Sequence, residues 1–285
     1  MTKTNQQKVK DFLINNGVII VMFILVIYTG FTSDNFFTKN NFMNILMNMS
    51  SRLVIALGIA GCVITAGCDL SAGRMIGFGA CISGMLLQRM DYSGKFFPDM
   101  QPLNVFVVAL IAMLVCAAFG TVTGFFIAYL NVPPFIATLA MMEIVYGIGL
   151  IVTNATPLGG YVEQYTNVSN GKFLGINYLI WIAIIVAAIT WFIFNMTRHG
   201  KYMYAIGGNP QAAEVAGVPV KATLILIYMK AAAMYGLAGF MLGAKAGGAS
   251  VQTGYGYEME AIAACTIGGV SVTGGRGKVS PAIIG

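Results

Sequence analysis

The longest apolar stretches of this chain constrain its fold more than any other feature. Val18–Tyr28 and Trp181–Phe194 form two runs without a charged residue and without regular alternation of apolar and polar side chains. A strand crosses lipid only as part of a closed barrel, and barrel strands do alternate in this way. A helix crosses with about 20 apolar residues. The runs therefore predict an all-α fold, a polytopic bundle of transmembrane helices.

The composition excludes a soluble globule. Of the 285 residues, 58% are hydrophobic and 9% are charged, whereas soluble domains hold about 25% charged residues. A soluble enzyme, a disordered chain and a disulfide-stapled secreted domain are therefore excluded. The net charge of +6 comes from basic residues at the ends of apolar runs, which indicates membrane topology rather than nucleic-acid binding. We expect a lipid bilayer around the chain and no nucleic-acid partner.

Windows of about 20 apolar residues predict about eight spans. They cover residues 12–31, 44–66, 72–88, 103–130, 135–153, 177–196, 222–246 and 258–285. The polar segment 1–11 is basic, so the positive-inside rule places the N-terminus in the cytoplasm. Counting from there puts loops 89–102 and 154–176 outside and the basic stretch 198–221 inside, where its charge also belongs. We expect residues 1–285 to form one transmembrane domain.

Sequence motifs for catalysis are missing. The Walker A loop that cradles ATP needs the pattern G-x-x-x-x-G-K-[ST], and none of the Gly-Lys pairs of this chain fits it. The single histidine, His199, leaves no Ser-His-Asp or Cys-His arrangement within the membrane. The five cysteines show no C-x-x-C spacing. We therefore predict no catalytic residue, no metal site and no cofactor-binding site, in a chain that is not an enzyme.

Ionisable residues in or near the predicted spans are the first candidates for a transport pathway, because lipid makes charge costly. They are Arg52, Asp69, Arg74, Glu143, Lys230, Lys245, Glu258 and Glu260. A carrier coupled to protons or sodium would use such groups as its coupling site. Most of them could instead lie at a span end, snorkel to the interface or pair with one another. Glu143 is a pathway candidate on this ground alone.

The segment from Gly67 to Gly73 is typical of a break between two helices. Glycine permits the break, and Asp69 and Ser71 can cap the backbone amides that it frees. Non-helical backbone at membrane depth is tolerated only where protein buries it or where it lines a watery cavity. Asp69, Ser71 and Gly73 are therefore candidates for the pathway or its frame, with capping as the favoured role of the two polar side chains.

The basic stretch 198–221 contains signals for a short surface helix. Asn209 is a good N-cap, and Pro210 suits the first helical position. Residues 211–216 include strong helix formers, and Gly217 is a natural stop. A bare connection between two spans would not need a capped helix. The pattern therefore predicts a docking element for a cytoplasmic partner.

This stretch resembles a known family. The pattern Gly207-Gly208-Asn209-Pro210-x-Ala212-Ala213-x-x-x-Gly217-Val218 is similar to the coupling-helix segment of bacterial sugar-import ABC permeases, which include ribose, xylose and galactoside permeases of the branched-chain-permease superfamily. Other stretches agree in order, namely 69–74, 129–139, 267–271 and Gly274-Gly275. Within the family, Leu70–Arg74, Leu87–Asp91 and Phe97-Pro98 most resemble galactose/methyl-galactoside permeases.

The resemblance implies a set of partners in the bacterial inner membrane. Two permease chains would form the pathway, two cytoplasmic ATPase chains would supply ATP and Mg chemistry, and an extracytoplasmic sugar-binding protein would dock on loop 154–176. The coupling residues would be Gly208, Asn209, Pro210, Gln211, Ala212, Ala213, Glu214 and Gly217. Family members often have Glu where this chain has Gln211, and Glu214 could supply the missing charge. Family members also continue past residue 285, so we expect this chain to lack its final spans.

Three alternatives remain open from the sequence. The first is import of galactose or a methyl-galactoside by an ABC system. The second is a permease of the same family for ribose, xylose or another small solute. The third, from a different class, is an ion-coupled carrier that works without an ATPase.

Overall fold

The computed structural model describes residues 17–33, 35–275 and 277, and nearly all of them that have regular structure are helical. The predicted cytoplasmic segment 1–11 and the start of the first predicted span lie outside the described residues. The chain divides into two compact units, residues 1–46 and 47–285. The first unit contains α2 (Gly17–Thr32) and the first turns of α3 (Lys39–Ile64), and the second contains all later elements.

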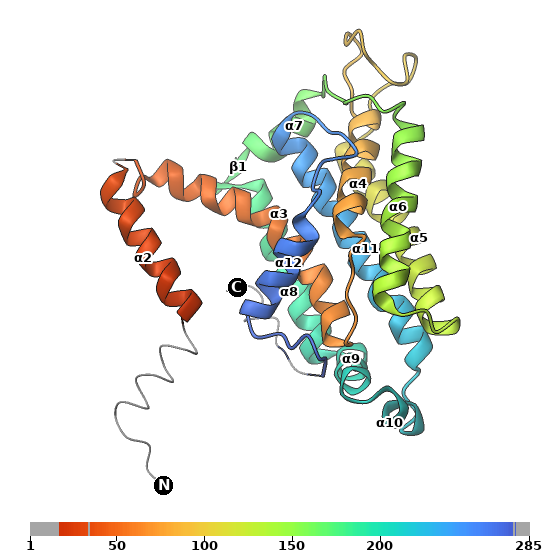
Figure 1. Ribbon diagram of the computed structural model, residues 1–285. Coiled ribbons are helices and arrows are strands. Elements are labelled where there is room, and N and C mark those ends of the chain that lie inside the picture. The colour runs from red at the N-terminus through yellow and green to blue at the C-terminus, as the bar shows by residue number, and fades with distance from the viewer. Residues whose placement is uncertain (1–16, 34, 276, 278–285) are drawn as a thin grey trace. The chain divides into compact units, whose positions relative to one another are not determined.

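The second unit contains the helices that carry the candidate site (Figure 1). After α3 they are α4 (Ala72–Leu86), α5 (Val105–Tyr129), α6 (Pro134–Val152), α7 (Glu163–Asn170), α8 (Tyr178–Met196), α9 (Arg198–Gly208), α10 (Pro210–Val215), α11 (Val220–Ala246) and α12 (Tyr257–Ile267). The strands β1 (Lys172–Phe173) and β2 (Ile176–Asn177) form a small antiparallel hairpin in which Lys172 pairs with Asn177. The helical prediction for the fold is therefore confirmed.

Five of the described helices are long and apolar enough to cross a membrane, namely α3, α5, α6, α8 and α11. Their bounds agree with the predicted spans to within a few residues. Two further apolar helices, α2 and α4, are shorter. The last predicted span, residues 258–285, contains α12, which has 11 residues and is too short to cross alone. The number of eight spans and the cytoplasmic N-terminus stay predictions.

Helix α11 packs against α4 and α5 through small residues that allow close approach. A Cβ on Gly120 of α5 would lie 2.4 Å from the carbonyl oxygen of Tyr228, and one on Gly236 would lie 2.4 Å from that of Ala112. Both distances are too short for a side chain, so glycine is required where these backbones meet. Small residues play this role in membrane helix packing because lipid gives apolar side chains no reason to cluster.

Side-chain caps fix where several helices begin. The Asn104 side chain accepts a hydrogen bond from the Phe106 amide at 2.9 Å, and Asn177 accepts one from Leu179 at 2.8 Å. Each bond satisfies one of the amides that a helix N-terminus leaves without a partner. These caps place the starts of α5 and α8 within two residues of the predicted spans.

The segment 154–176 is more ordered than a polar loop. It contains α7 and the β1–β2 hairpin, whose turn residues Leu174 and Gly175 have φ of 53° and 78°. Tyr165 of α7 is fully buried, and its hydroxyl donates to the Phe240 carbonyl of α11 at 2.7 Å. This buried hydrogen bond therefore attaches the segment to the C-terminal part of α11. An eight-residue helix without a side-chain cap leaves no periodic pattern long enough to be recognised in sequence.

Two non-helical segments interrupt the helical packing. Helix α3 ends at Ile64 and α4 begins at Ala72, which confirms the break predicted at residues 67–71. A second interruption, residues 247–256, separates α11 from α12. Figure 1 shows α12 beside α4, with the second interruption leading into it.

Candidate coupling segment and helix breaks

Helix α10 forms as the sequence predicts. The Asn209 side chain accepts a hydrogen bond from the Ala212 amide at 2.9 Å, and Pro210 is the first helical residue. The helix ends at Val215, and Gly217 has a φ of 81°, in the left-handed region that favours glycine. These three residues therefore fix both ends of α10. A docking role for the helix is not tested by this geometry.

All but one of the candidate coupling residues are exposed, and they form the outer face of the α10 segment. Gly208, Asn209, Pro210, Gln211, Ala212, Glu214 and Gly217 are exposed. Ala213 is buried, with 4% of its surface exposed, so it points into the fold rather than toward a partner. Val215 is 91% exposed and places an apolar side chain at the tip of the segment. The sequence motif did not single out Val215, because only burial distinguishes it from other apolar residues.

Helix α9 joins α10 to the membrane helices. A Cβ on Gly207 would lie 1.9 Å from the Ile64 carbonyl at the end of α3, and one on Gly200 would lie 2.1 Å from the Phe194 carbonyl of α8. Met203 and Ile206 on the same helix are buried. Helix α9 therefore lies in direct backbone contact with α3 and α8. Helix α9 was not predicted from the sequence, because its glycine-rich composition is typical of a loop.

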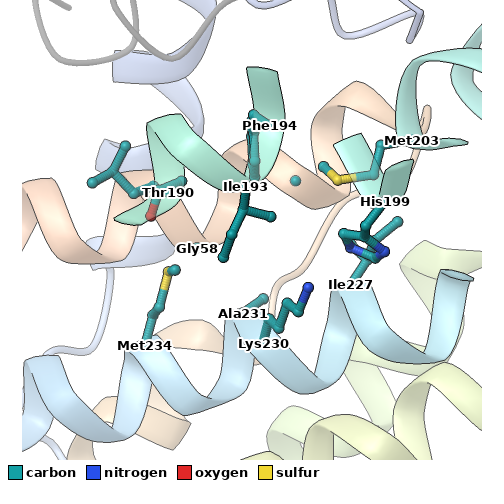
Figure 2. Close-up of a pocket in the computed structure, with 12 residues that line it drawn as sticks. Gly58, Thr190, Ile193, Phe194, His199, Met203, Ile227, Lys230, Ala231 and Met234 are labelled. Carbon is teal, nitrogen blue, oxygen red and sulfur yellow. The ribbon is translucent and has the colours of Figure 1, made fainter. Parts of the chain in front are cut away.

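A small cavity lies where α9 meets α3, α8 and α11 (Figure 2). Its volume is about 20 Å³, room for about one water molecule. His199 of α9 and Lys230 of α11 both line it. Burial and, second, the charge of Lys230 lower the pKa of His199 from 6.5 to about 4, so His199 is neutral at pH 7.

Asp69 organises the break between α3 and α4. Its side chain is 1% exposed, and its Oδ1 accepts hydrogen bonds from the Ser71 amide at 3.0 Å and the Ser71 hydroxyl at 2.6 Å. The Tyr235 hydroxyl of α11 donates to Oδ2 at 3.1 Å. Ser71 occupies the N-cap position of α4, but its side chain makes no cap bond. The predicted capping role is therefore wrong for Ser71, whereas Asp69 binds one backbone amide at the break and joins the break to α11.

Gly73 and Glu143 occupy different environments. A Cβ on Gly73 would lie 2.0 Å from Glu258 Oε2 and 2.9 Å from the Gly254 carbonyl, so glycine is needed where α12 meets α4. Glu258 is 6% exposed, and its Oε2 has no hydrogen-bond partner among the described residues. Glu143, on α6, is exposed. The structure thus groups Asp69, Ser71 and Gly73 and leaves Glu143 apart.

Arg74 lies at the centre of a group that we call the Arg74 cluster, made of Arg74, Tyr146, Gln252 and Tyr255. Its guanidinium carbon lies 3.9 Å from the ring centroid of Tyr146 and 4.2 Å from that of Tyr255. Its Nη1 donates to Gln252 Oε1 at 2.7 Å, and Gln252 Nε2 donates to the Tyr146 hydroxyl at 3.1 Å. Only Arg74 of the four was singled out from the sequence, because its charge is the sole local signal.

The other predicted intramembrane ions include one pair. Arg52 of α3 lies 3.1 Å from Glu260 of α12, and its guanidinium also lies over the Tyr257 ring at 5.1 Å. Both members of the pair are about half exposed. This pairing is one of the alternatives expected for charges at membrane depth.

The family model described as "Branched-chain amino acid transport system / permease component" matches residues 41–285. The chain belongs to this permease family. All candidate site residues lie within the matched range.

Individual relatives of this permease agree with the family match. It is 39% identical over 292 residues to the galactose/methyl galactoside import permease protein MglC of Escherichia coli (strain K12), with 100% of this chain and 87% of the relative covered. It is 41% identical over 292 residues to the MglC protein of Haemophilus influenzae, with the same coverage. The ribose import permease protein RbsC of E. coli (strain K12) is 32% identical over 280 residues, covering 97% of this chain and 84% of the relative. No solved structure matches.

Family membership and the five apolar helices together make the chain a multi-pass membrane permease. The match starts two residues after the start of α3 and runs through both helix breaks and the α9–α10 segment. The family match therefore includes every described element from α4 to α12.

Proposed function

We propose that this chain is the transmembrane subunit of an ATP-binding-cassette importer for galactose or a methyl-galactoside. The observation that carries the proposal is the 39–41% identity to permeases named for galactose and methyl galactoside, against 32% for ribose permeases. The family match supports the permease role independently of the sugar. ATP and Mg would act on a separate ATPase chain, because no ATP-binding motif occurs in this sequence.

The orientation follows from charge. We infer a cytoplasmic N-terminus in a bacterial inner membrane, with about eight spans in residues 1–285 as one transmembrane domain. Arg198, Lys201 and Lys221 flank the α9–α10 segment, and the positive-inside rule favours the cytoplasm for such a cluster. The fastened α7 segment then lies on the outer side, where an extracytoplasmic sugar-binding protein would dock.

The outer face of α10 is the proposed contact with the ATPase. Gly208, Asn209, Pro210, Gln211, Ala212, Glu214 and Gly217 would enter a cleft of the ATPase, and the exposed Val215 adds an apolar contact at the tip. Ala213 would support this face from inside. ATP binding would move α10, and the close contacts of α9 with Ile64 and Phe194 would transmit the motion to α3 and α8. Alternating access would follow from that displacement.

The break residues have a supporting role in the same scheme. Asp69, Ser71 and Gly73 build a non-helical frame inside the membrane region, which is tolerated beside protein or water. The exposed carboxylate of Glu143 belongs on a surface that lipid does not cover, either the pathway or a second permease chain. A homodimer would supply that second chain.

Reconstitution tests the proposal. The permease would be placed in proteoliposomes with its ATPase and its binding protein, and uptake of labelled galactose, methyl-galactoside and ribose would be measured with and without ATP. We expect ATP-dependent uptake of a galactoside. Uptake driven by a proton or sodium gradient without the ATPase would instead establish the ion-coupled carrier, and ATP-dependent uptake of ribose alone would reassign the sugar.

A further inference from the structure

The second non-helical segment lies against α4 and α6. A Cβ on Gly77 of α4 would lie 2.7 Å from the Val251 carbonyl and 2.9 Å from that of Thr253. On α6, a Cβ on Gly149 would lie 2.8 Å from a Val251 methyl carbon. Residues 247–256 therefore pack against glycine faces of α4 and α6. Their position is fixed by backbone contacts and not by the Arg74 cluster alone.

These contacts place the Arg74 cluster at membrane depth. Tyr146 precedes Val152, the last residue of α6, by six positions, which corresponds to about 9 Å at a rise of 1.5 Å per residue. The hydrogen bond from Gln252 to the Tyr146 hydroxyl brings the second non-helical segment to a similar depth. Backbone without helical hydrogen bonds is found at such depth only when protein buries it or water reaches it.

The polar side chains of the cluster are exposed or partly exposed among the described residues. Tyr255 is 59% exposed, Gln252 is exposed, and Arg74 is partly exposed. None of the ion pairs found among the described residues includes Arg74. An arginine facing hydrocarbon costs about 2.5–3.5 kcal/mol even on insertion scales. The cluster therefore faces water or a polar surface rather than lipid.

The side chains in the cluster suit a neutral, hydroxyl-rich solute. The outer face of an exposed tyrosine ring can stack on the apolar C–H face of a sugar, while its hydroxyl stays available for hydrogen bonding. Arginine offers several donors in a rigid plane, and glutamine offers both a donor and an acceptor. Sites for small solutes combine such apolar walls with a few placed polar groups.

We propose that the Arg74 cluster lines the water-filled path of the permease and contacts the hydroxyl groups of the sugar as it passes. The proposal rests on the permease function proposed above and adds the residues that meet the solute. Tyr255 and Gln252 form the exposed contact. Arg74 holds both in place, through the Tyr255 ring and the Gln252 amide. The second non-helical segment thereby becomes part of the wall of the path.

Thiol labelling tests the water-filled path without any assumption about the sugar. Gln252→Cys and Tyr255→Cys would each be assembled with the ATPase and treated with a charged, membrane-impermeant methanethiosulfonate. The matched control is Ile185→Cys, an exposed position in the middle of the apolar helix α8. The unaltered chain, whose five cysteines are buried or partly buried, gives the background rate.

We expect the two cluster cysteines to react at least tenfold faster than the Ile185→Cys control, in the nucleotide-free or the ATP-trapped state. Rates equal to the control in both states would overturn the proposal. Fast labelling that galactoside and binding protein do not slow would overturn the sugar contact.

Transport kinetics separate a contact from a structural role. We expect Tyr255→Ala to raise the KM for galactoside uptake about tenfold while ATPase activity stimulated by the binding protein stays within twofold. Tyr255→Phe keeps the stacking ring and loses only the hydroxyl, so it should raise the KM less than Tyr255→Ala. If the unaltered importer moves no galactoside, the proposed function fails. If it does and both Tyr255 variants match it in KM, only this inference fails.

Discussion

The α9–α10 segment and the Arg74 cluster are built in opposite ways. In α10, a cap, a proline and a left-handed glycine within nine residues determine the local structure, and most side chains are exposed. The Arg74 cluster joins α4, α6 and the segment 247–256, whose members are up to 181 positions apart in the sequence. This permease therefore has its clearest local sequence signals at the proposed ATPase contact, and its non-local contacts at the proposed path.

This difference predicts different mutant behaviour. Changes on the outer face of α10 should alter coupling and leave folding intact, because no buried contact is lost. Changes at the breaks should lower stability as well as transport, because buried polar groups lose partners there. Four variants test that division, beginning with the contact between α9 and the end of α3.

The largest effect is expected at Gly207, where α9 meets the end of α3. Gly207→Ala places a Cβ 1.9 Å from the Ile64 carbonyl, and overpacking of this kind costs about 2–3 kcal/mol of folding free energy. Thermal unfolding in detergent measures this loss of stability. Gly208→Ala is the matched control, since no atom lies within 4 Å of its Cβ, and it should shift stability by less than about 0.5 kcal/mol. Equal midpoints for the two variants would show that α9 does not fit α3 so closely.

Asp69 should give the next largest effect. Asp69→Leu leaves the Ser71 amide and the Tyr235 hydroxyl buried without their acceptor, which costs about 2 kcal/mol. Asp69→Asn keeps one acceptor oxygen, so we expect a smaller loss in the same thermal unfolding measurement. Should the asparagine variant prove as unstable as the leucine variant, charge rather than hydrogen bonding would be what the break requires.

A variant at Val215 tests whether coupling to the ATPase can be lost while the permease stays folded. Val215→Asp puts a charge on an exposed apolar tip, and we expect the affinity for the ATPase to fall about tenfold, or about 1.4 kcal/mol. Co-purification at graded ATPase concentrations measures the affinity, and thermal unfolding of the isolated permease should not change. Val215→Ala serves as the milder control. Unaltered ATPase binding by Val215→Asp would remove the tip of α10 from the interface.

The smallest effect is expected from His199. Its pKa is about 4 in the folded chain and 6.5 without burial, so the unfolded chain binds more protons between these values. Stability is therefore complete above pH 6.5 and falls as the pH drops toward 4. Since His199 is partly exposed, we expect a loss below about 1 kcal/mol. Thermal unfolding would be measured at pH 7 and pH 5. The unaltered chain should lose this stability at pH 5, and His199→Gln should not.

Local signals in the sequence were enough to predict α10 and the break at Asp69. Asn209, Pro210 and Gly217 act on their own neighbours, so their effect needs no knowledge of the rest of the fold. The long apolar helices were equally accessible, because their lengths follow from bilayer thickness. The break at Asp69 could also be predicted locally, because an acidic side chain between glycines is itself a local pattern.

Contacts between residues far apart in the chain could not be predicted from the sequence. Gly207 is one of many glycines, and only the position of Ile64 shows why it cannot be another residue. Gln252 and Tyr255 become notable only when Arg74 is found between them and Tyr146. Burial also moved Ala213 inside and Val215 outside, although both lie in the same six-residue helix. Such assignments depend on packing, which sequence periodicity does not report for so short a helix.

ATP-driven uptake of galactoside tests the central claim most directly. Proteoliposomes containing this permease, its ATPase and its binding protein would be loaded with ATP and supplied with labelled galactoside outside. We expect uptake that requires both ATP and the ATPase. Val215→Asp should reduce this uptake although the variant remains folded. Galactoside uptake that persists without the ATPase, or that Val215→Asp leaves unchanged, would contradict coupling through α10.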